Sequence, residues 1–439
     1  MRIPPSIDAL HAAYAEGLSP HALLALLDAR ADDIADPGIF LHRPEAAQRD
    51  AAIAALPPFD PWRFPLWGVP IAVKDNIDVA CMPTTAGCPA FAHVAQVHAP
   101  AVARLVAAGG VIVGKTNLDQ FATGLVGVRT PYPAPRNACS AAHVPGGSSS
   151  GSAVAVAQGL ALLALGTDTA GSGRVPAALN GIVGLKPSLG AVPTRGVVPA
   201  CPSLDCVSVF ARSVTDAWRG FVAMAGEDAA DPWSRAIILS DPREAPPLRR
   251  LGIPSASTLH LDGAEQRAAW DASLRRIEGF AAIEELDLSP FLEVARLLYE
   301  GAFLAERDAA FGGAVSRDAM HPVTQRILAG AARFSATDAF AALHRLASLR
   351  LATMPSWTRV DALLLPTAPN FPTLAELEAD PITPNARLGT YTNFANLLDL
   401  AALAIPGAAR PDGLPFGVTL VGPRGSDARL ARFAMEIAA

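Results

Sequence analysis

The stretch that decides the fold of this chain is residues 145–188, which read PGGSSSGSAVAVAQGLALLALGTDTAGSGRVPAALNGIVGLKPS. Within it, SAVAVAQGLA predicts a helix, LLALGTDT predicts a buried strand that ends in a turn, and GIVGLKP predicts another short strand. Strands and helices in alternation are typical of a mainly parallel sheet with helices on both faces. The stretch therefore predicts an α/β fold.

The same alternation continues on the N-terminal side. Residues 69–76 (VPIAVKDN) and 111–117 (VIVGKTN) predict strands, and AVARLVAAGG at 101–110 predicts the helix between them. Residues 1–55 carry apolar side chains at a spacing of three to four, which predicts a helical N-terminal region packed on the core. A proline-rich passage at 57–70 ends that region.

On the C-terminal side, residues 215–355 are more helical and more charged. Strand signals return at 360–369 (VDALLLPTAP) and at 416–423 (FGVTLVGP). An α/β core that carries a helical insertion explains this return better than separate domains do. We therefore expect one domain over residues 56–439, built on a mixed, mostly parallel sheet, with a helical insertion at about 215–355.

Composition narrows the class of protein. The 439 residues are 51% hydrophobic and 17% charged, which is ample material for a globular core. A formal net charge of -6 leaves no basic footprint and argues against nucleic acid as a partner. The apolar runs are too short or too polar for a signal peptide or a membrane span. Five cysteines, an odd number without metal-ligand spacing, favour reduced thiols in a cytoplasm.

The glycine- and serine-rich loop at 145–157 has three interpretations. It could be a flexible linker, but a proline precedes it and an apolar helix follows without a gap. It could cradle a phosphate, but the Gly-Lys-Ser/Thr ending of such loops is missing. The third interpretation is a tight backbone that holds several hydroxyls at a helix N-terminus, where spare N–H groups favour negative charge.

A second candidate loop follows the strand that ends near residue 168. Its residues Thr169, Ala170, Gly171 and Ser172 are small enough for the backbone to approach a ligand closely. Consecutive N–H groups there could point at one oxygen, as an oxyanion hole requires. The plain alternative is an ordinary glycine-rich turn, in which serine is common.

The third candidate is Lys74, at the end of the apolar strand at 69–76. Of the 35 basic residues only three are lysines, Lys74, Lys115 and Lys186, and they lie in the part of the chain richest in motifs. A strand-end lysine is usually solvated, but burial can lower a lysine pKa until it acts as a base near neutral pH. No histidine lies inside the three motifs, although His143 precedes the glycine loop. A Ser–His–Asp triad stays open, because triad order along a chain is free.

Taken together, the three segments resemble the amidase-signature family. Its pattern places a lysine in GxPxxxKD, a first serine in GGSS and a second serine in GTDxxGS, which here fall on Lys74, Ser148 and Ser172. The offset of 24 residues between the two serines is the usual family spacing. Further matching stretches are 115–124, 184–188, 203–217 and 363–369.

The resemblance implies a mechanism. Ser172 is expected to be the nucleophile, Ser148 the proton relay and Lys74 the base of an amide hydrolase. It further implies a cis peptide bond between Gly147 and Ser148, a homodimer, and no metal or organic cofactor. The oxyanion hole it implies consists of the N–H groups of Thr169, Ala170, Gly171 and Ser172.

Three stretches, 121–137, 297–307 and 391–407, resemble specifically the allophanate hydrolases of this family. Allophanate is urea with a carboxylate on one nitrogen, a small anionic amide of urea degradation and nitrogen metabolism. Such a substrate needs a bidentate cation and a hydrogen-bonding group.

The resemblance assigns substrate binding to Tyr299, Arg307 and Gly124. Tyr299 and Arg307, eight residues apart on a predicted helix, can face one pocket. The plain alternatives are a surface ion pair of Arg307 with Glu306 or Asp308, and half-buried packing of Tyr299.

Relatives of this type commonly carry a C-terminal domain that decarboxylates the first product. The stretch 416–423, where the amidase domain should end, lies near the end of this sequence. We therefore expect that domain to be absent here and its activity to be separate or fused elsewhere. Competing functions are a broad-range aliphatic amidase, the glutaminase component of a tRNA amidotransferase, and a catalytically dead binding protein on the same scaffold.

Overall fold

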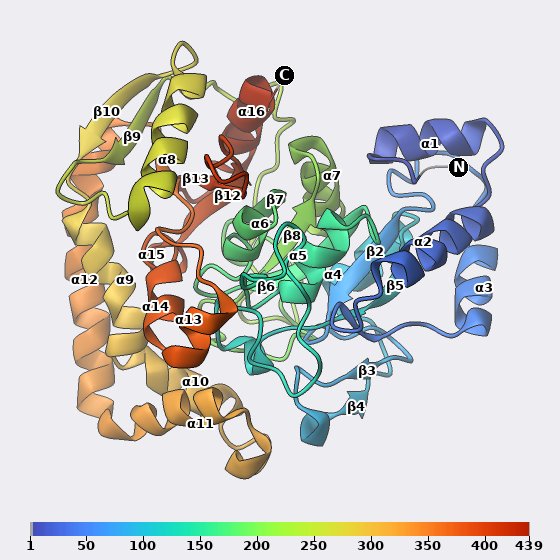
Figure 1. Ribbon diagram of the computed structural model, residues 1–439, viewed down its shortest axis with the longest axis horizontal. Helices are drawn as coiled ribbons and strands as arrows, with labels where there is room; N and C mark the ends of the chain where they lie inside the picture. The colour runs from blue at the N-terminus through green and yellow to red at the C-terminus, as the bar shows by residue number, and fades with distance from the viewer. Residues whose placement is uncertain (1–2, 439) are drawn as a thin grey trace.

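The computed structural model describes residues 3–438, which form a large sheet covered by helices (Figure 1). The sheet has 11 strands in the order β1-β5-β2-β6-β8-β7-β12-β13-β11-β9-β10. They are β1 (Phe40–His42), β2 (Pro70–Lys74), β5 (Val111–Thr116), β6 (Leu163–Asp168), β7 (Val183–Lys186), β8 (Cys206–Ala211), β9 (Arg250–Pro254), β10 (Ala282–Leu286), β11 (Ala362–Pro366), β12 (Leu400–Pro406) and β13 (Gly417–Pro423). A second, two-stranded sheet pairs β3 (Pro83–Thr84) with β4 (His93–Val94).

The mixed sheet flanked by helices that the sequence predicted is confirmed. Parallel pairing occurs in two blocks, β5-β2-β6 and β11-β9-β10. Between these blocks, β8, β7, β12 and β13 pair antiparallel with their neighbours. The alternation of strand and helix signals predicted the parallel blocks, but β8 and β12 lie in apolar stretches whose strand character the sequence pattern did not reveal.

The helices are of very different lengths. They are α1 (Ile7–Ala15), α2 (Pro20–Ile34), α3 (Ala46–Ala54), α4 (Pro100–Ala107), α5 (Ser150–Ala157), α6 (Val175–Leu179), α7 (Val214–Met224), α8 (Gly263–Ile277), α9 (Ser289–Glu300), α10 (Phe303–Phe311), α11 (Pro322–Ala329), α12 (Ala336–Arg359), α13 (Leu374–Ala379), α14 (Thr383–Leu388), α15 (Phe394–Leu397) and α16 (Asp427–Ala438). Several begin at a serine whose hydroxyl accepts a backbone N–H of the first turn, such as Ser6, Ser213 and Ser335.

Helices cover both faces of the sheet. On β6, the side chain of Leu163 meets Gly220 in α7, whereas Gly166 approaches Ser149, just before α5. Because side chains alternate between the faces of a strand, these two positions point to opposite sides. The long loop into α5 and the loop after β6 therefore meet on one face of the sheet, where the candidate residues lie.

The N-terminal region is helical except for β1. This strand pairs antiparallel with β5 and was too short to give a sequence signal. The region packs on the core as expected, because the Tyr14 hydroxyl donates to the Gly68 carbonyl at 2.7 Å and Ile7 and Leu10 are buried.

The expectation of a helical insertion at 215–355 needs a correction. That stretch contains α7 to α11 and most of α12, but also β9 and β10, which extend the main sheet in parallel beside β11. These strands were missed because they are short and β10 is half exposed, so neither shows a clear alternation of apolar and polar residues. Within residues 3–438, no helix is long and apolar enough to cross a membrane.

Candidate active site

Lys74 lies at the end of β2, completely buried in the sheet. Its Nζ is 2.7 Å from the Ser148 hydroxyl and 2.7 Å from the Thr167 hydroxyl on the neighbouring strand β6. Burial lowers the pKa of Lys74 to about 7, although the more distant carboxylates of Asp119, Asp205 and Asp168 work in the opposite direction. A lysine with this pKa is substantially neutral at neutral pH and can accept a proton.

All three lysines of the chain are fully buried, but their surroundings differ. Lys115 has a carboxylate partner, Asp75 at 3.2 Å, and Lys186 donates to the Pro187 carbonyl at 2.8 Å. Burial lowers the pKa of both. Lys74 alone contacts two hydroxyl groups, so it alone is placed to exchange a proton with a serine.

Ser148 is presented by a tight loop directly before α5. The Gly147–Ser148 peptide bond is cis, as the family resemblance implied. The Ser148 carbonyl accepts from the Asp119 N–H at 3.0 Å, and the Gly147 N–H donates to the Leu125 carbonyl at 2.8 Å. A Cβ at Gly147 would lie 2.1 Å from the Asp119 carboxylate, so only glycine permits this approach.

Ser172 lies in the loop between β6 and α6 and is 2% exposed. The N–H groups of Ala170, Gly171 and Ser172 donate none of the hydrogen bonds found among residues 3–438. Three successive free donors beside a hydroxyl can serve an oxyanion. No hydrogen bond of the described residues joins Ser172 to Ser148, so direct contact is limited to the Lys74–Ser148 pair.

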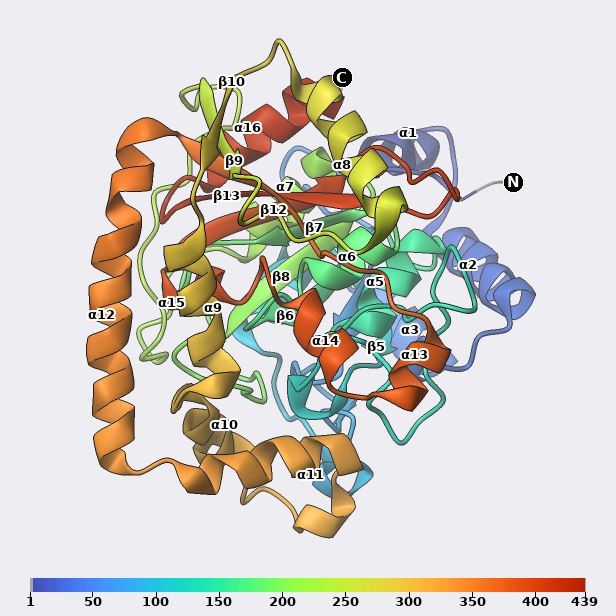
Figure 2. The same cartoon turned by 60° about the vertical axis from the view of Figure 1, so that its left-hand side comes forward.

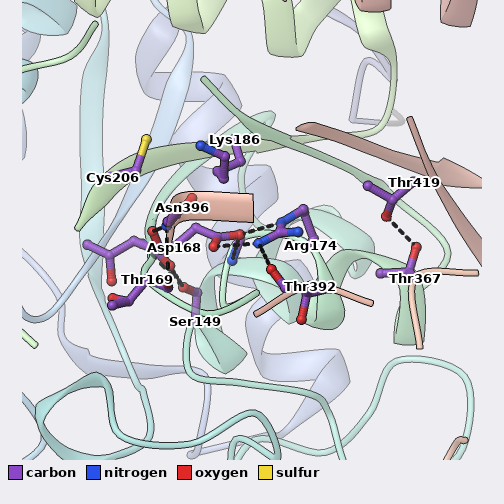
Figure 3. Close-up of polar contacts among 12 residues, drawn as sticks. Ser149, Asp168, Thr169, Arg174, Lys186, Cys206, Thr367, Thr392, Asn396 and Thr419 are labelled. Carbon is purple, nitrogen blue, oxygen red and sulfur yellow. Dashed lines mark hydrogen bonds and ion pairs between the residues drawn. The ribbon is translucent and has the colours of Figure 1, made fainter. Parts of the chain in front are cut away.

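Two polar anchors hold the Ser172 loop from behind (Figure 3). The Asp168 carboxylate accepts from the Gly173 N–H at 3.0 Å and forms a buried ion pair with Arg174, in which Nε and Nη2 donate at 2.8 and 2.9 Å. Burial opposes ionisation of Asp168, but Arg174 outweighs it and the pKa of Asp168 lies below its ordinary value. Arg174 also donates to the Thr392 carbonyl at 3.0 Å.

The second anchor is Asn396 on α15. Its amide nitrogen lies 2.6 Å from the Asp168 carbonyl, 3.0 Å from the Thr169 carbonyl and 2.9 Å from the Leu204 carbonyl. By holding carbonyls that precede the free N–H groups, Asn396 orients the peptide units of the loop. Sequence patterns did not reveal Asn396, Arg174 or Thr167. Asn396 and Arg174 fall inside matching stretches, but nothing in the residue types singles out their roles.

Thr169 and Gly171 have separate structural reasons. The Thr169 hydroxyl donates to Asp205, a buried carboxylate that also accepts the Ala200 N–H at 2.8 Å. Burial raises the pKa of Asp205 above its ordinary value. Gly171 has φ 146°, and a Cβ there would lie 2.3 Å from the Thr392 hydroxyl. The loop can therefore pass this close to Thr392 only with glycine at 171.

Arg307, on α10, is completely buried without a carboxylate partner. Its Nη2 donates to the Tyr299 hydroxyl at 3.1 Å, its Nη1 donates to the Thr123 hydroxyl at 3.3 Å, and its Nε has no partner among the described residues. The guanidinium also lies 5.0 Å from the centre of the half-buried Tyr299 ring. The structure thus brings Arg307 and Tyr299 together, and Gly124 follows Thr123 directly.

The plain alternative of a surface ion pair for Arg307 is wrong. Glu306 accepts from the backbone N–H and the hydroxyl of Ser203, each at 2.7 Å, and Asp308 pairs with Arg317. An uncompensated cation in the interior is costly unless an anion binds there. The surroundings of Arg307 therefore suit the binding of an anion.

A cavity of about 560 Å³ borders Tyr299 and Leu125. One carboxylate, Glu300, lines it together with five arginines: Arg129, Arg296, Arg326, Arg333 and Arg387. Only Arg387 has an ion-pair partner among residues 3–438, Asp262. The cavity beside Tyr299 therefore carries positive charge and favours anions.

His143 does not join the serines. Its Nδ1 lies 2.8 Å from the Ser140 hydroxyl, and its ring packs against Phe371 with centroids 4.9 Å apart. Within residues 3–438, no three His, Cys, Asp or Glu side chains are grouped so that they could hold a metal ion. The five cysteines are all free thiols.

Comparison with known proteins gives consistent relationships. The model of the Amidase family matches residues 40–431. The urea amidolyase of Lachancea kluyveri is 45% identical over 377 residues, which cover 85% of this chain and 21% of that protein. A glutamyl-tRNA(Gln) amidotransferase component of Symbiobacterium thermophilum is 36% identical over 410 residues, covering 84% of this chain and 82% of that protein.

Among solved structures, an allophanate hydrolase of Kluyveromyces lactis superposes with a TM-score of 0.91 at 38% identity, covering 98% of this chain and 72% of that one. The urea amidolyase of the same yeast superposes with a TM-score of 0.92 at 39% identity, covering 99% of this chain and 27% of that one. The chain thus spans about a fifth of the length of the urea amidolyase sequences that it matches.

Proposed function

This chain belongs to the amidase family and is an amidohydrolase, and we propose that it hydrolyses the terminal amide of allophanate. The single observation that carries this proposal is Arg307, a fully buried guanidinium that contacts Tyr299 and Thr123 and no carboxylate. A carboxylated urea supplies an anion for this cation. Its planar carboxylate matches the fork of a guanidinium in a bidentate pair.

The proposed nucleophile is Ser172, with Ser148 as relay and Lys74 as base. Ser172 Oγ attacks the amide carbonyl of the substrate, and its proton passes through Ser148 to neutral Lys74. The N–H groups of Ala170, Gly171 and Ser172, with that of Thr169, stabilise the oxyanion. Protonated Lys74 then returns the proton through Ser148 to the departing nitrogen, which leaves as ammonia.

Water completes the cycle by attacking the acyl-enzyme formed on Ser172. Lys74, neutral again, accepts a proton from this water through Ser148, and the ester bond to Ser172 breaks. Overall, allophanate and water give ammonium and a urea-derived dicarboxylate, so one anionic charge becomes two. A pKa of about 7 for Lys74 suits both directions of proton transfer near neutral pH.

The arginine-lined cavity supports the charge of the proposed ligands. Substrate and product are both anions, and the cavity beside Tyr299 has four arginines without an ion-pair partner among residues 3–438 and a single carboxylate. Field lines from such a cavity raise the local concentration of anions and speed their encounter with the site.

A glutaminase function is the second candidate, because a component of a tRNA amidotransferase is 36% identical over most of its length. Glutamine carries an α-ammonium group as well as a carboxylate. That ammonium would enter a cavity with five arginines and only Glu300 as a counter-charge. The charge of the cavity therefore favours allophanate over glutamine.

We further propose a cytoplasmic setting, in keeping with five free thiols, and a partner activity that decarboxylates the dicarboxylate product. That activity can reside on a fused domain or on a separate polypeptide. Gly124 is proposed to border the substrate, because it follows Thr123, which contacts Arg307.

An ammonia-release assay tests the proposed function. Allophanate, biuret, malonamate, glutamine and simple aliphatic amides are compared at equal concentration. We expect the highest kcat/KM with allophanate, weaker turnover of malonamate, and little turnover of glutamine. Preference for glutamine or for a neutral amide would overturn the assignment.

A further inference from the structure

The helix α12 is apolar on two sides. On its inner side Leu346, Leu349 and Thr353 are buried, and this side packs against α9. On its outer side Phe340, Leu343, Leu351 and Met354 are 64%, 50%, 73% and 52% exposed. Figure 1 and Figure 2 both place α12 at the left margin, with α9 on its inner side. A solvent-facing apolar stripe on a helix whose core side is already packed indicates a partner.

The outer stripe is symmetric about Ala347. Phe340 and Met354 lie seven residues before and after it, and Leu343 and Leu351 lie four residues before and after it. With about 100° per residue, all four side chains project within about 40° of the direction of Ala347. Reversing the helix therefore exchanges one aromatic or thioether side chain for the other and one leucine for the other, so the stripe is complementary to itself.

We propose that α12 is the contact of a two-fold dimer, in which a second copy of this chain lays its α12 antiparallel across the first. The axis passes beside Ala347, whose small side chain lets the helices approach closely. Phe340 then faces the partner's Met354, and Leu343 faces the partner's Leu351. Such an interface is isologous, because the same patch serves both copies.

The size of the stripe sets the strength of the contact. The four exposed side chains and their neighbouring alanines would bury on the order of 1,000 Å² between two copies, near the lower end of specific interfaces. We therefore expect a reversible dimer whose population depends on concentration. This inference rests on exposure and spacing alone and does not depend on the proposed substrate.

Cross-linking tests the axis. In a background with the exposed thiols removed by Cys81→Ser and Cys139→Ser, the variant Ala347→Cys places one thiol directly across from its copy. Diamide oxidation should give a covalent dimer. Ala352→Cys, also exposed on α12 but turned away from the stripe, is the matched control and should stay monomeric on denaturing gels. Equal cross-linking of both variants, or of neither, would overturn the proposed axis.

Sedimentation velocity from about 1 µM to about 100 µM measures the association itself. The unmodified chain should shift from monomer to dimer, and Leu351→Glu or Leu343→Lys should keep it monomeric. The double variant Leu343→Lys with Leu351→Glu places opposite charges across the axis twice and should restore the dimer. A dimer that Leu351→Glu leaves intact would place the contact elsewhere. A monomer throughout would leave α12 without the proposed partner and would also overturn the proposal. Unchanged kcat/KM per chain in Leu351→Glu separates this outcome from any failure of the active site.

Discussion

The amine of Lys74 lies 2.7 Å from the hydroxyl of Ser148, and both side chains are completely buried. The carboxylates nearest in charge effect, Asp119, Asp205 and Asp168, make no hydrogen bond to the amine. Its only hydrogen-bond partners among residues 3–438 are the hydroxyls of Ser148 and Thr167. An amine in this position has little to stabilise its charged form, and this arrangement makes the chemistry of the site sensitive to pH.

Activity should therefore rise with pH along a limb centred near pH 7. Lys74 accepts a proton only when neutral, and the neutral fraction grows as pH increases through its pKa of about 7. The apparent value belongs to the coupled Lys74–Ser148 pair. Profiles of kcat/KM against pH measure it. Lys74→Arg and Lys74→Ala should both be inactive at every pH, because guanidinium stays charged and alanine cannot accept a proton. An active Arg variant would remove Lys74 from the role of base.

Ser172→Ala should abolish turnover without unfolding the chain. The substitution removes the proposed attacking atom and little volume, so circular dichroism and Tm should match those of the control Ser257→Ala, an exposed serine. Ser148→Ala should lose on the order of 10²- to 10⁴-fold in kcat, because the relay to Lys74 is broken. More than a trace of activity in Ser172→Ala would place the nucleophile elsewhere.

Arg307→Ala should lose about 30- to 1000-fold in kcat/KM for allophanate, the cost of a charge-assisted bidentate partner. Any weak activity on neutral amides should be unchanged or higher, because an unpaired buried cation disappears. Arg307→Lys should recover part of the loss, and Tyr299→Phe should lose less. Arg317→Ala, which removes an exposed partner of Asp308, is the control. Equal losses on both substrate classes would make Arg307 a structural residue.

Asn396→Ala should lower kcat more than it raises KM. Without its amide, the Asp168 and Thr169 carbonyls lose their donor and the N–H groups that follow lose their orientation. We expect about 1–3 kcal/mol of lost stability, measured by urea unfolding, and a fall in kcat on the order of 10- to 100-fold. Asn370→Ala, a half-buried asparagine that donates to the Pro384 carbonyl, is a control for the loss of an amide. A stability loss with unchanged kcat in the folded variant would contradict the orienting role.

The arginine-lined cavity should make allophanate hydrolysis sensitive to ionic strength. Salt screens the field of Arg326 and Arg333, so kcat/KM for allophanate should fall on the order of 3- to 10-fold from about 0.02 M to about 0.5 M salt. A neutral amide should show no such fall. Arg326→Ala combined with Arg333→Ala should flatten the dependence on salt. An equal slope for both substrates would exclude attraction by the cavity.

Much of the site could be predicted because its chemistry depends on short local patterns. The loops around Ser148 and Ser172 need glycine where a Cβ would collide with Asp119 or Thr392, and such glycines are visible in the sequence. The anchoring role of Asn396 was not predictable, because it reaches across more than two hundred residues to the Asp168 carbonyl. Contacts of that kind depend on tertiary packing alone.

The sheet shows the same limit. The buried strands β2, β5 and β6 give continuous apolar runs, and the sequence predicted them. The strands β9 and β10 were assigned to a helical stretch, because their half-polar edge sequences resemble their surroundings. Pairing direction was also hidden, since an apolar run looks alike in parallel and antiparallel neighbours.

The complete burial of the three lysines has a practical consequence for handling this enzyme. Amine-reactive reagents such as N-hydroxysuccinimide esters meet no lysine on the folded surface of the chain. Coupling to a resin or dye at mild pH is therefore directed away from lysine side chains and toward the terminal amine. Lysine labelling becomes a report of unfolding, since Lys74, Lys115 and Lys186 react only when the sheet opens.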